Sequence, residues 1–139
     1  MDLLIELTPN PIDLLRPLPQ ELAGTAGAVA EFRGLVRGEE HGRPIGGLEY
    51  EVYSPMAERT MRQICTELAA SGHCLYVRVT HRIGMVPVGE AAIHVVVASQ
   101  HRAAGFAFLT GFMDRLKQEV PIWKLRALDR TGRPLPPAP

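Results

Sequence analysis

Lys117 and Lys124 are the only two lysines in this 139-residue chain, and they flank the segment Pro-Ile-Trp at 121–123. Apart from the histidines, every other basic side chain is an arginine. Arginine stays protonated in proteins, whereas the amine of a lysine can be tuned to give up its proton. The two lysines therefore indicate positions that need an amine for acid–base or nucleophilic chemistry. The alternative is that arginine is the default cation of this chain and that two lysines remain by chance.

His101 and Arg102 stand where a predicted strand gives way to a predicted helix. The first turn of a helix has free N–H groups and a positive potential, so it binds anions readily. An arginine at that place adds a planar fork that suits phosphate or carboxylate. This pair therefore predicts an anion site, although a polar residue at the helix start followed by a solvated charge explains it equally simply.

Sixteen residues separate His101 from Lys117, which is roughly 24 Å along a helix at about 1.5 Å per residue. One small pocket of a single chain cannot contain both. If both serve one site, that site lies across a symmetric dimer interface, where His101 and Arg102 of one copy face Lys117 and Lys124 of the other.

Lys117 lies beside the apolar stripe of its predicted helix. Its side chain either covers the core with its aliphatic stem or acts as a base, acid or nucleophile. In the second case, burial and nearby cations such as Arg37 would lower its pKa. Trp123, just before Lys124, is either a wall of a pocket for a heterocyclic ligand or simple core.

The elements that must position these residues follow from apolar periodicity and from breakers. Helices are predicted at 54–72, begun by Ser54 and Pro55, and at 102–120, ended by Pro121. The fold class expected is α+β. The predicted strands are 3–8, 27–37, 47–53, 75–82 and 91–99, and a bulge is expected at Gly34 in the second of them. The segments between them are predicted to be a short helix at 12–16, a polar mobile loop at 38–46 and a turn-rich connection at 84–90.

Length and composition predict one domain at 1–128 followed by a Pro-rich, weakly ordered tail at 129–139. A formal net charge of +0 argues against a nucleic-acid surface. No apolar run approaches the ~20 residues that span a bilayer. Cys65 and Cys74 lack zinc-ligand spacing, so we expect no metal site. We expect the two thiols to be reduced and the protein to be cytoplasmic. No cofactor is expected.

Five motifs together resemble one known family, the catalytic large subunit of molybdopterin synthase. They cover most of the chain between residues 27 and 124 and occur in the family's order. The motifs are FRGLVR (32–37), LEYEVY (48–53), HRIGMVPVGE (81–90), SQHRAAGFAF (99–108) and FMDRLKQEVPIWK (112–124).

The resemblance implies an α/β hammerhead-type fold with a mixed or antiparallel sheet and packed helices. It implies a sulfurtransferase that converts cyclic pyranopterin monophosphate into molybdopterin by installing the two sulfurs of the dithiolene. The sulfur comes from the C-terminal thiocarboxylate of a small ubiquitin-like subunit with a Gly-Gly end. The implied assembly is a heterotetramer around a homodimer of large subunits.

Carried over by position, the resemblance makes Lys117 the catalytic lysine at the thiocarboxylate and Lys124 the second catalytic lysine of the pocket. Because the thiocarboxylate sulfur is itself the nucleophile, no cysteine is needed. The substrate-binding positions implied are Arg37, His101 and Arg102, with the arginines on the phosphate, Phe32 and Met113 in the pocket wall, and Arg126.

Two departures from the family pattern stand near the end of the chain. The family usually continues W-K-[KR]-E, whereas Leu125 and Arg126 follow Lys124 here, so a base replaces an acid. The tail is also shorter than in the family. A non-catalytic dimeric paralogue that binds a ubiquitin-like partner is therefore the alternative function, and an anion-binding domain unrelated to sulfur is a third.

Overall fold

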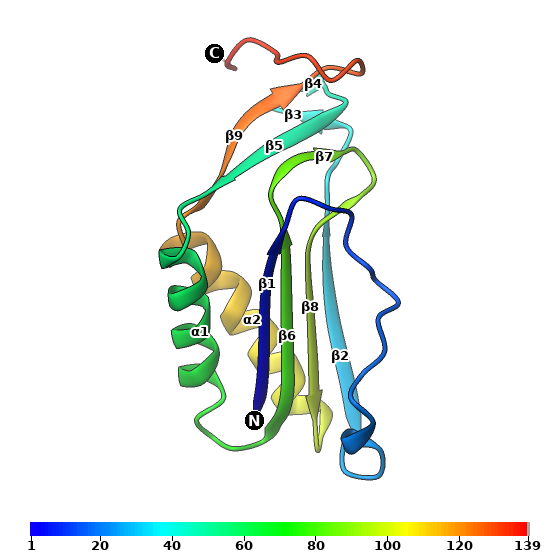
Figure 1. Ribbon diagram of the computed structural model, residues 1–139, viewed down its shortest axis with the longest axis vertical. Coiled ribbons are helices and arrows are strands. Elements are labelled where there is room, and N and C mark those ends of the chain that lie inside the picture. Colours follow the sequence, from blue (N-terminus) through cyan, green and yellow to red (C-terminus); the bar gives the residue numbers. More distant parts are fainter. Residues whose placement is uncertain (139) are drawn as a thin grey trace.

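The computed structural model of the chain describes residues 1–138 and is built on a mixed four-stranded sheet (Figure 1). Its strands are β1 (Asp2–Thr8), β6 (Cys74–Arg82), β8 (Ala91–Ser99) and β2 (Ala28–Leu35), in that spatial order. β1 runs parallel to β6, and the other two pairings are antiparallel. The predicted α+β class with a mixed sheet is confirmed.

β8 is a central strand of the sheet, as its almost continuous apolar sequence predicts. Every residue from 91 to 99 is buried, and the strand pairs with β6 on one side and β2 on the other. The bulge predicted at Gly34 is confirmed by a register shift between Gly34 and Leu35. A Cβ atom at position 34 would lie 2.7 Å from Cγ2 of Ile93, so any larger residue there would force the Ile93 side chain to shift.

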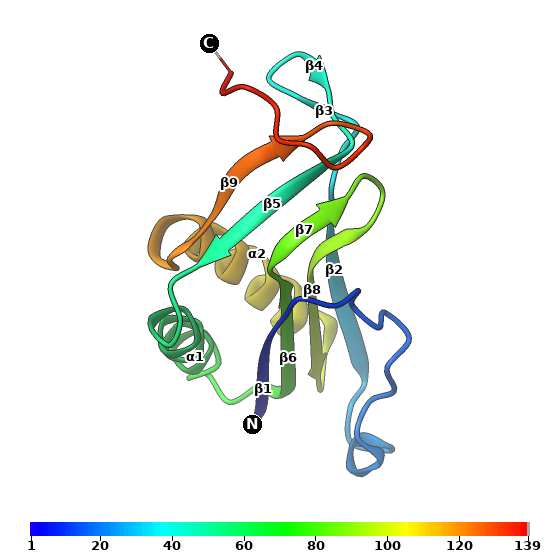
Figure 2. The ribbon, with the colours of Figure 1, turned by 45° about the horizontal axis from the view of Figure 1, so that its top comes forward.

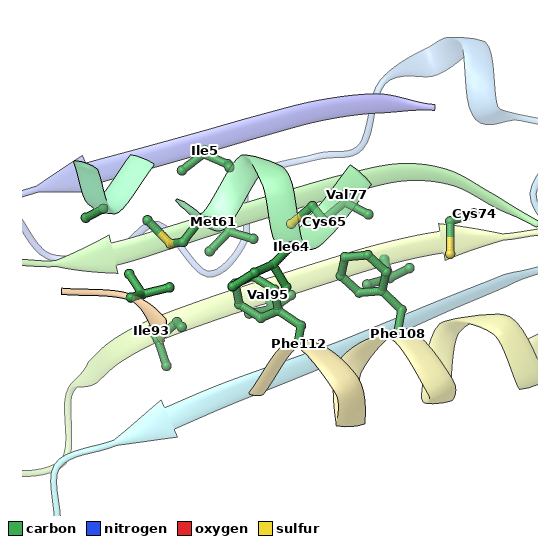
Figure 3. Close-up of a cluster of buried hydrophobic side chains, with 14 residues drawn as sticks. Ile5, Met61, Ile64, Cys65, Cys74, Val77, Ile93, Val95, Phe108 and Phe112 are labelled. Atoms are coloured by element: carbon green, nitrogen blue, oxygen red, sulfur yellow. The ribbon is translucent and has the colours of Figure 1, made fainter. Parts of the chain in front are cut away.

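Two helices, α1 (Met56–Leu68) and α2 (Arg102–Glu119), cover one face of this sheet and enclose its core (Figures 1 and 3). We call this core the helical core. Phe108 and Phe112 of α2 stack in it with ring centroids 6.0 Å apart. Its fourteen buried members are Ile5, Ala57, Met61, Ile64, Cys65, Cys74, Val77, Val79, Ile93, Val95, Val97, Phe108, Phe112 and Val120.

Helix α1 starts later and ends earlier than predicted, at Leu68 with Ala69 and not Gly72 in the C-cap position. The prediction that Ser54 caps it is wrong, because Pro55 occupies the cap position and no side chain bonds the free N–H groups there. Helix α2 ends at Glu119, immediately before Val120 and Pro121, as predicted. The α2 stripe also includes buried Phe108, which the predicted pattern omitted.

A second sheet of three antiparallel strands crosses the end of the first (Figure 2). It has the order β7 (Gly84–Pro87), β5 (Gly47–Val52) and β9 (Ile122–Leu128). The sequence does not predict β7, because this strand is short and is bounded by glycine and proline. It does not predict β9, because a register shift interrupts the alternation of that strand. The small core beneath this sheet, which we call the distal core, contains Val36, Ile45, Leu48, Val86, Ala92 and Ala127.

Residues 38–46, predicted to be a loop, contain a hairpin of β3 (Glu39–Glu40) and β4 (Arg43–Pro44). His41 and Gly42 form its tip, with φ values of 52° and 76°, as a two-residue hairpin turn requires. The predicted helix at 12–16 is wrong. The prolines of this region instead leave it irregular up to the short 3₁₀ helix η1 (Gln20–Leu22).

The segment after β9 folds back as a turn. Oδ1 of Asp129 accepts hydrogen bonds from the backbone N–H groups of Thr131 and Arg133, and the N–H of Leu135 donates to the carbonyl oxygen of Ala127. No helix within residues 1–138 combines the length and apolar character needed to cross a membrane.

Candidate active site

A cleft of about 530 Å³ lies between the two sheets and the C-terminal half of α2. β2, β5, β6, β8, α2 and β9 all contribute to its wall. Both lysines line it, together with Phe32 and Met113. Four residues that are dispersed between positions 32 and 124 of the sequence therefore meet in one cavity that combines two amines with an apolar wall.

Lys117 reaches the cleft from the last turn of α2. Met113 and Leu116, one turn and one residue earlier, line the same cavity, while Phe112 is fully buried in the helical core. The packed face of the helix thus fixes where Lys117 stands. Within the described chain, Lys117 has no salt-bridge or hydrogen-bond partner for its amine.

Lys124 reaches the cleft from β9, and a bulge decides its direction. Tyr50 pairs with Lys124 and Glu49 pairs with Arg126, so Leu125 is an extra residue in β9. Neighbouring residues of β5 face opposite sides of the sheet, and two residues paired across adjacent strands face the same side. Lys124 therefore lies on the Tyr50 side, toward the cleft, and Arg126 lies on the Glu49 side. Bulges commonly re-aim side chains in this way beside active sites.

The amine of Lys124 is paired with a carboxylate. Its Nζ lies 3.1 Å from Oε1 and 3.5 Å from Oε2 of Glu40, on the β3–β4 hairpin. Lys124 also borders a second cavity of about 310 Å³, which we call the outer hollow. The hairpin, the end of β9 and residues 135–138 enclose this hollow.

Two cleft residues, His81 and Tyr50, were not predicted. His81 is buried, its Nδ1–H donates a 2.8 Å hydrogen bond to the carbonyl oxygen of Arg82, and its ring meets the Tyr50 ring edge-on at 5.3 Å. Burial lowers the pKa of His81, although the hydrogen bond to Arg82 opposes that shift. Burial also raises the pKa of Tyr50, with a further contribution from the charge of Glu40. His81 lines the cleft, and its Nε2 has no hydrogen-bond partner among residues 1–138. The sequence signal that could have indicated His81 is its position two residues after Val79, because Val77, Val79 and His81 alternate on the same, inward face of the strand.

The remaining predicted residues lie outside this cleft. Arg37 is exposed beyond the end of β2, and His101 and Arg102 lie at the opposite end of α2 from Lys117. Arg126 lines the outer hollow, and its Nε lies 3.1 Å from Oε2 of Glu49. The base that replaces the acid of the family pattern is thus neutralised across the sheet. Within one copy of the chain, the predicted phosphate-binding residues therefore lie away from the two lysines.

Neither cysteine lines this cleft. Both are free and buried, and burial raises the pKa of Cys65 to about 12 and also raises the pKa of Cys74. In the described part of the chain, no group of three or more His, Cys, Asp or Glu side chains is arranged to hold a metal ion.

The sequence and fold are similar to those of known proteins. The family described as MoaE protein matches residues 7–119. The human molybdopterin synthase catalytic subunit is 43% identical over 98 residues, which are 70% of this chain and 52% of that protein. The chain spans about half the length of this and the other mammalian relatives that it matches.

Two solved structures have the same fold. Molybdopterin synthase from Staphylococcus aureus superposes with a TM-score of 0.76 at 31% identity and covers 88% of this chain and 89% of its own. A complex of subunits 1 and 2 of molybdopterin-converting factor from Helicobacter pylori gives a TM-score of 0.74 at 22% identity, with 95% and 93% covered.

Proposed function

This chain belongs to the MoaE protein family, and we propose that it is the catalytic subunit of a molybdopterin synthase. In this role it is a sulfurtransferase. It transfers sulfur from the C-terminal thiocarboxylate of a small ubiquitin-like subunit to cyclic pyranopterin monophosphate and so forms the dithiolene of molybdopterin.

The observation that supports this function most strongly is the convergence of Lys117 and Lys124 on one cleft. A thiocarboxylate is an anion, so two amines at the end of an inserted peptide can hold it by charge-assisted hydrogen bonds. The sulfur is the nucleophile, and an amine beside it can move the protons that the reaction requires. Phe32 and Met113 supply an apolar wall against which a flat pterin ring packs.

The phosphate of the substrate needs cationic partners. In one copy of the chain, the lysines are the only Lys or Arg side chains that line the cleft within residues 1–138. We propose that His101 and Arg102 of a second copy supply them. β2 ends the four-stranded sheet, and its outer edge has no strand partner in the part of the chain that the structure describes. Val29 and Leu35 of β2 are exposed, and so is Phe106 of α2, the helix that packs against β2. An apolar open edge of this kind favours pairing with another strand.

Antiparallel pairing of two β2 strands about a two-fold axis would place Ala28 of one copy beside Leu35 of the other. Ala28 pairs with Ser99, three residues before the start of α2 at Arg102, and Leu35 lines the cleft. This dimer would therefore carry His101 and Arg102 of the second copy to the mouth of the cleft. Arg37, two residues beyond Leu35, would face the same opening.

We propose a small ubiquitin-like subunit as the other partner, in a heterotetramer around the dimer. The Helicobacter pylori neighbour, described as a complex of subunits 1 and 2, supports a partner of this kind. The proposed compartment is the cytoplasm, where two free thiols stay reduced.

Reconstitution tests the function. The purified chain, a small subunit with a C-terminal thiocarboxylate and cyclic pyranopterin monophosphate should yield molybdopterin, detected as its dithiolene. A chain that binds the small subunit but forms no product would instead be the non-catalytic paralogue. Absence of both binding and product would favour an unrelated anion-binding domain.

Mixing two inactive variants tests the shared site. In a dimer of one Arg102→Ala chain and one Lys117→Ala chain, one of the two sites keeps both residues. Random mixing at equal amounts should restore about a quarter of wild-type activity, because half of the dimers are mixed and each has one intact site. If no activity returns although mixed dimers form, the site is not shared between copies.

A further inference from the structure

The pairing of Lys124 with Glu40 is the contact of this cleft that the proposed reaction leaves unexplained. The two residues are 84 positions apart, and the hairpin that carries Glu40 belongs to neither of the larger sheets. The Glu40 side chain is only 16% exposed, although it is ionisable and lies on a two-residue strand. A carboxylate is buried to this degree when a cation compensates it, and the amine of Lys124 is that cation.

The backbone alone cannot place the amine of Lys124. The bulge at Leu125 determines the side of β9 from which the side chain leaves, but a lysine stem has four carbons and about 2 kcal/mol of rotamer entropy. Arg126, the nearest other charged residue along the strand, is turned to Glu49. Glu40 is therefore the group that holds the far end of the side chain at the boundary between the cleft and the outer hollow.

The hairpin is anchored well enough to do this. Ile45, directly after it, is buried in the distal core, and its N–H donates to the carbonyl oxygen of Gly38 across the base of the hairpin. The N–H of Gly46 then donates to the carbonyl oxygen of Leu128, at the end of β9. The strand that carries Lys124 and the hairpin that carries Glu40 are thus joined by main-chain bonds.

We propose that Glu40 is a positioning residue for the sulfur transfer, and that it acts by fixing the amine of Lys124 between the two cavities. This inference rests on the proposed function. Lys117 needs no such group, because a packed helix already places it. Two other basic residues lie near Glu40. Nε2 of His41 is 3.8 Å from Oε1 on a largely exposed side chain, and Arg43 is opposite Glu40 on β4 but forms no salt bridge with it among residues 1–138.

The chain supplies a matched control. Glu39 precedes Glu40 on the same strand but is exposed and has no ion pair among residues 1–138. Glu40→Gln keeps the size of the side chain and removes its charge, Glu40→Asp keeps the charge, and Glu39→Gln removes a charge from the neighbouring position. Glu40→Gln should lower kcat by roughly ten- to a hundredfold, as a misplaced catalytic group does, with a smaller change in KM. Glu40→Asp should recover part of the loss, and Glu39→Gln should match the wild type.

A second measurement follows the amine itself. With two lysines in the chain, reductive ¹³C-methylation gives two side-chain NMR signals, which Lys→Arg variants assign. In Glu40→Gln, the signal of methylated Lys124 should shift and sharpen as the side chain becomes free. The signal of methylated Lys117 should not change, and Glu39→Gln should leave both signals in place.

The inference is overturned if Glu40→Gln retains the wild-type kcat, if Glu39→Gln loses as much activity, or if the Lys124 signal does not respond. A wild-type protein that forms no molybdopterin would overturn the proposed function separately, because the NMR comparison needs no substrate. In that case an unchanged Lys124 signal in Glu40→Gln would also exclude the contact, and a shifted one would leave Glu40 as an anchor without a reaction to serve.

Discussion

The helical core and the distal core place the two lysines in different ways. Lys117 stands on a helix whose buried face is part of the fourteen-residue helical core. Lys124 stands on a bulged strand over a core of six buried residues, and a carboxylate from a separate hairpin holds its amine. The first lysine is positioned by packing, and the second by local backbone geometry and one ion pair. The cleft lies where these two regions meet, so its shape depends on both.

The largest expected effect is the loss of the lysine that packing places. Lys117→Ala should lower kcat by about 10²–10⁴-fold, the usual contribution of a group that moves protons in the transition state. The change lies at an exposed position, so the fold should remain intact by circular dichroism and thermal unfolding. Lys117→Arg is the control, because it keeps the cation but replaces an amine that can give up its proton by a guanidinium that stays protonated. A normal rate in Lys117→Ala would remove this residue from the mechanism.

The next effect compares the two cores directly. Phe112→Ala removes a fully buried ring from the helical core and should destabilise the fold by ~3–5 kcal/mol. Leu48→Ala, in the distal core, should cost ~2 kcal/mol, at the low end for such a truncation, because fewer neighbours surround it. Urea unfolding of both variants measures the difference. Equal losses would show that the distal core is as tightly packed as the helical core.

A smaller effect concerns pH and His81. Burial lowers the pKa of His81 below its ordinary value of 6.5 in the folded state. The unfolded chain therefore binds more protons between the two pKa values, so folding stability falls as the pH drops from 6.5 through that range. Replacing His81 by Phe keeps a ring against Tyr50 and removes this titration. The stability of that variant should decline less between pH 7 and pH 5 than that of the wild type. An identical decline in both would contradict a lowered pKa of His81 in the folded state.

The smallest effect is expected at the cross-strand pair that replaces the acid of the family pattern. Arg126→Glu places two carboxylates opposite each other on β5 and β9 and should destabilise the fold by about 0.2–1 kcal/mol. The double exchange of Glu49→Arg with Arg126→Glu should recover that loss, which a double-mutant cycle in urea measures. If the single variant retains full stability, the Arg126 pair contributes nothing to the distal region.

Local sequence predicts more of the helical-core region than of the distal-core region. α2, the central strand β8 and the bulge at Gly34 were predicted correctly, because apolar periodicity, a continuous apolar run and a glycine within a strand are local signals. β7, β9 and the β3–β4 hairpin were not predicted. All are short or irregular. β7 and β9 are strands because β5 pairs with both of them, and, across residues 1–138, β3 and β4 pair only with each other.

By itself, the sequence determined that two amines stand on either side of a helix end, that one helix separates the anion-binding candidates from them, and which family the chain resembles. Only the tertiary structure decided that Lys117 and Lys124 share a cleft, that His81 and Tyr50 line it, and that Glu40 holds Lys124. The reason is physical. A periodic pattern reports which face of an element is buried, whereas a bulge, a strand pairing or an ion pair across 84 residues depends on which distant segments the fold brings together.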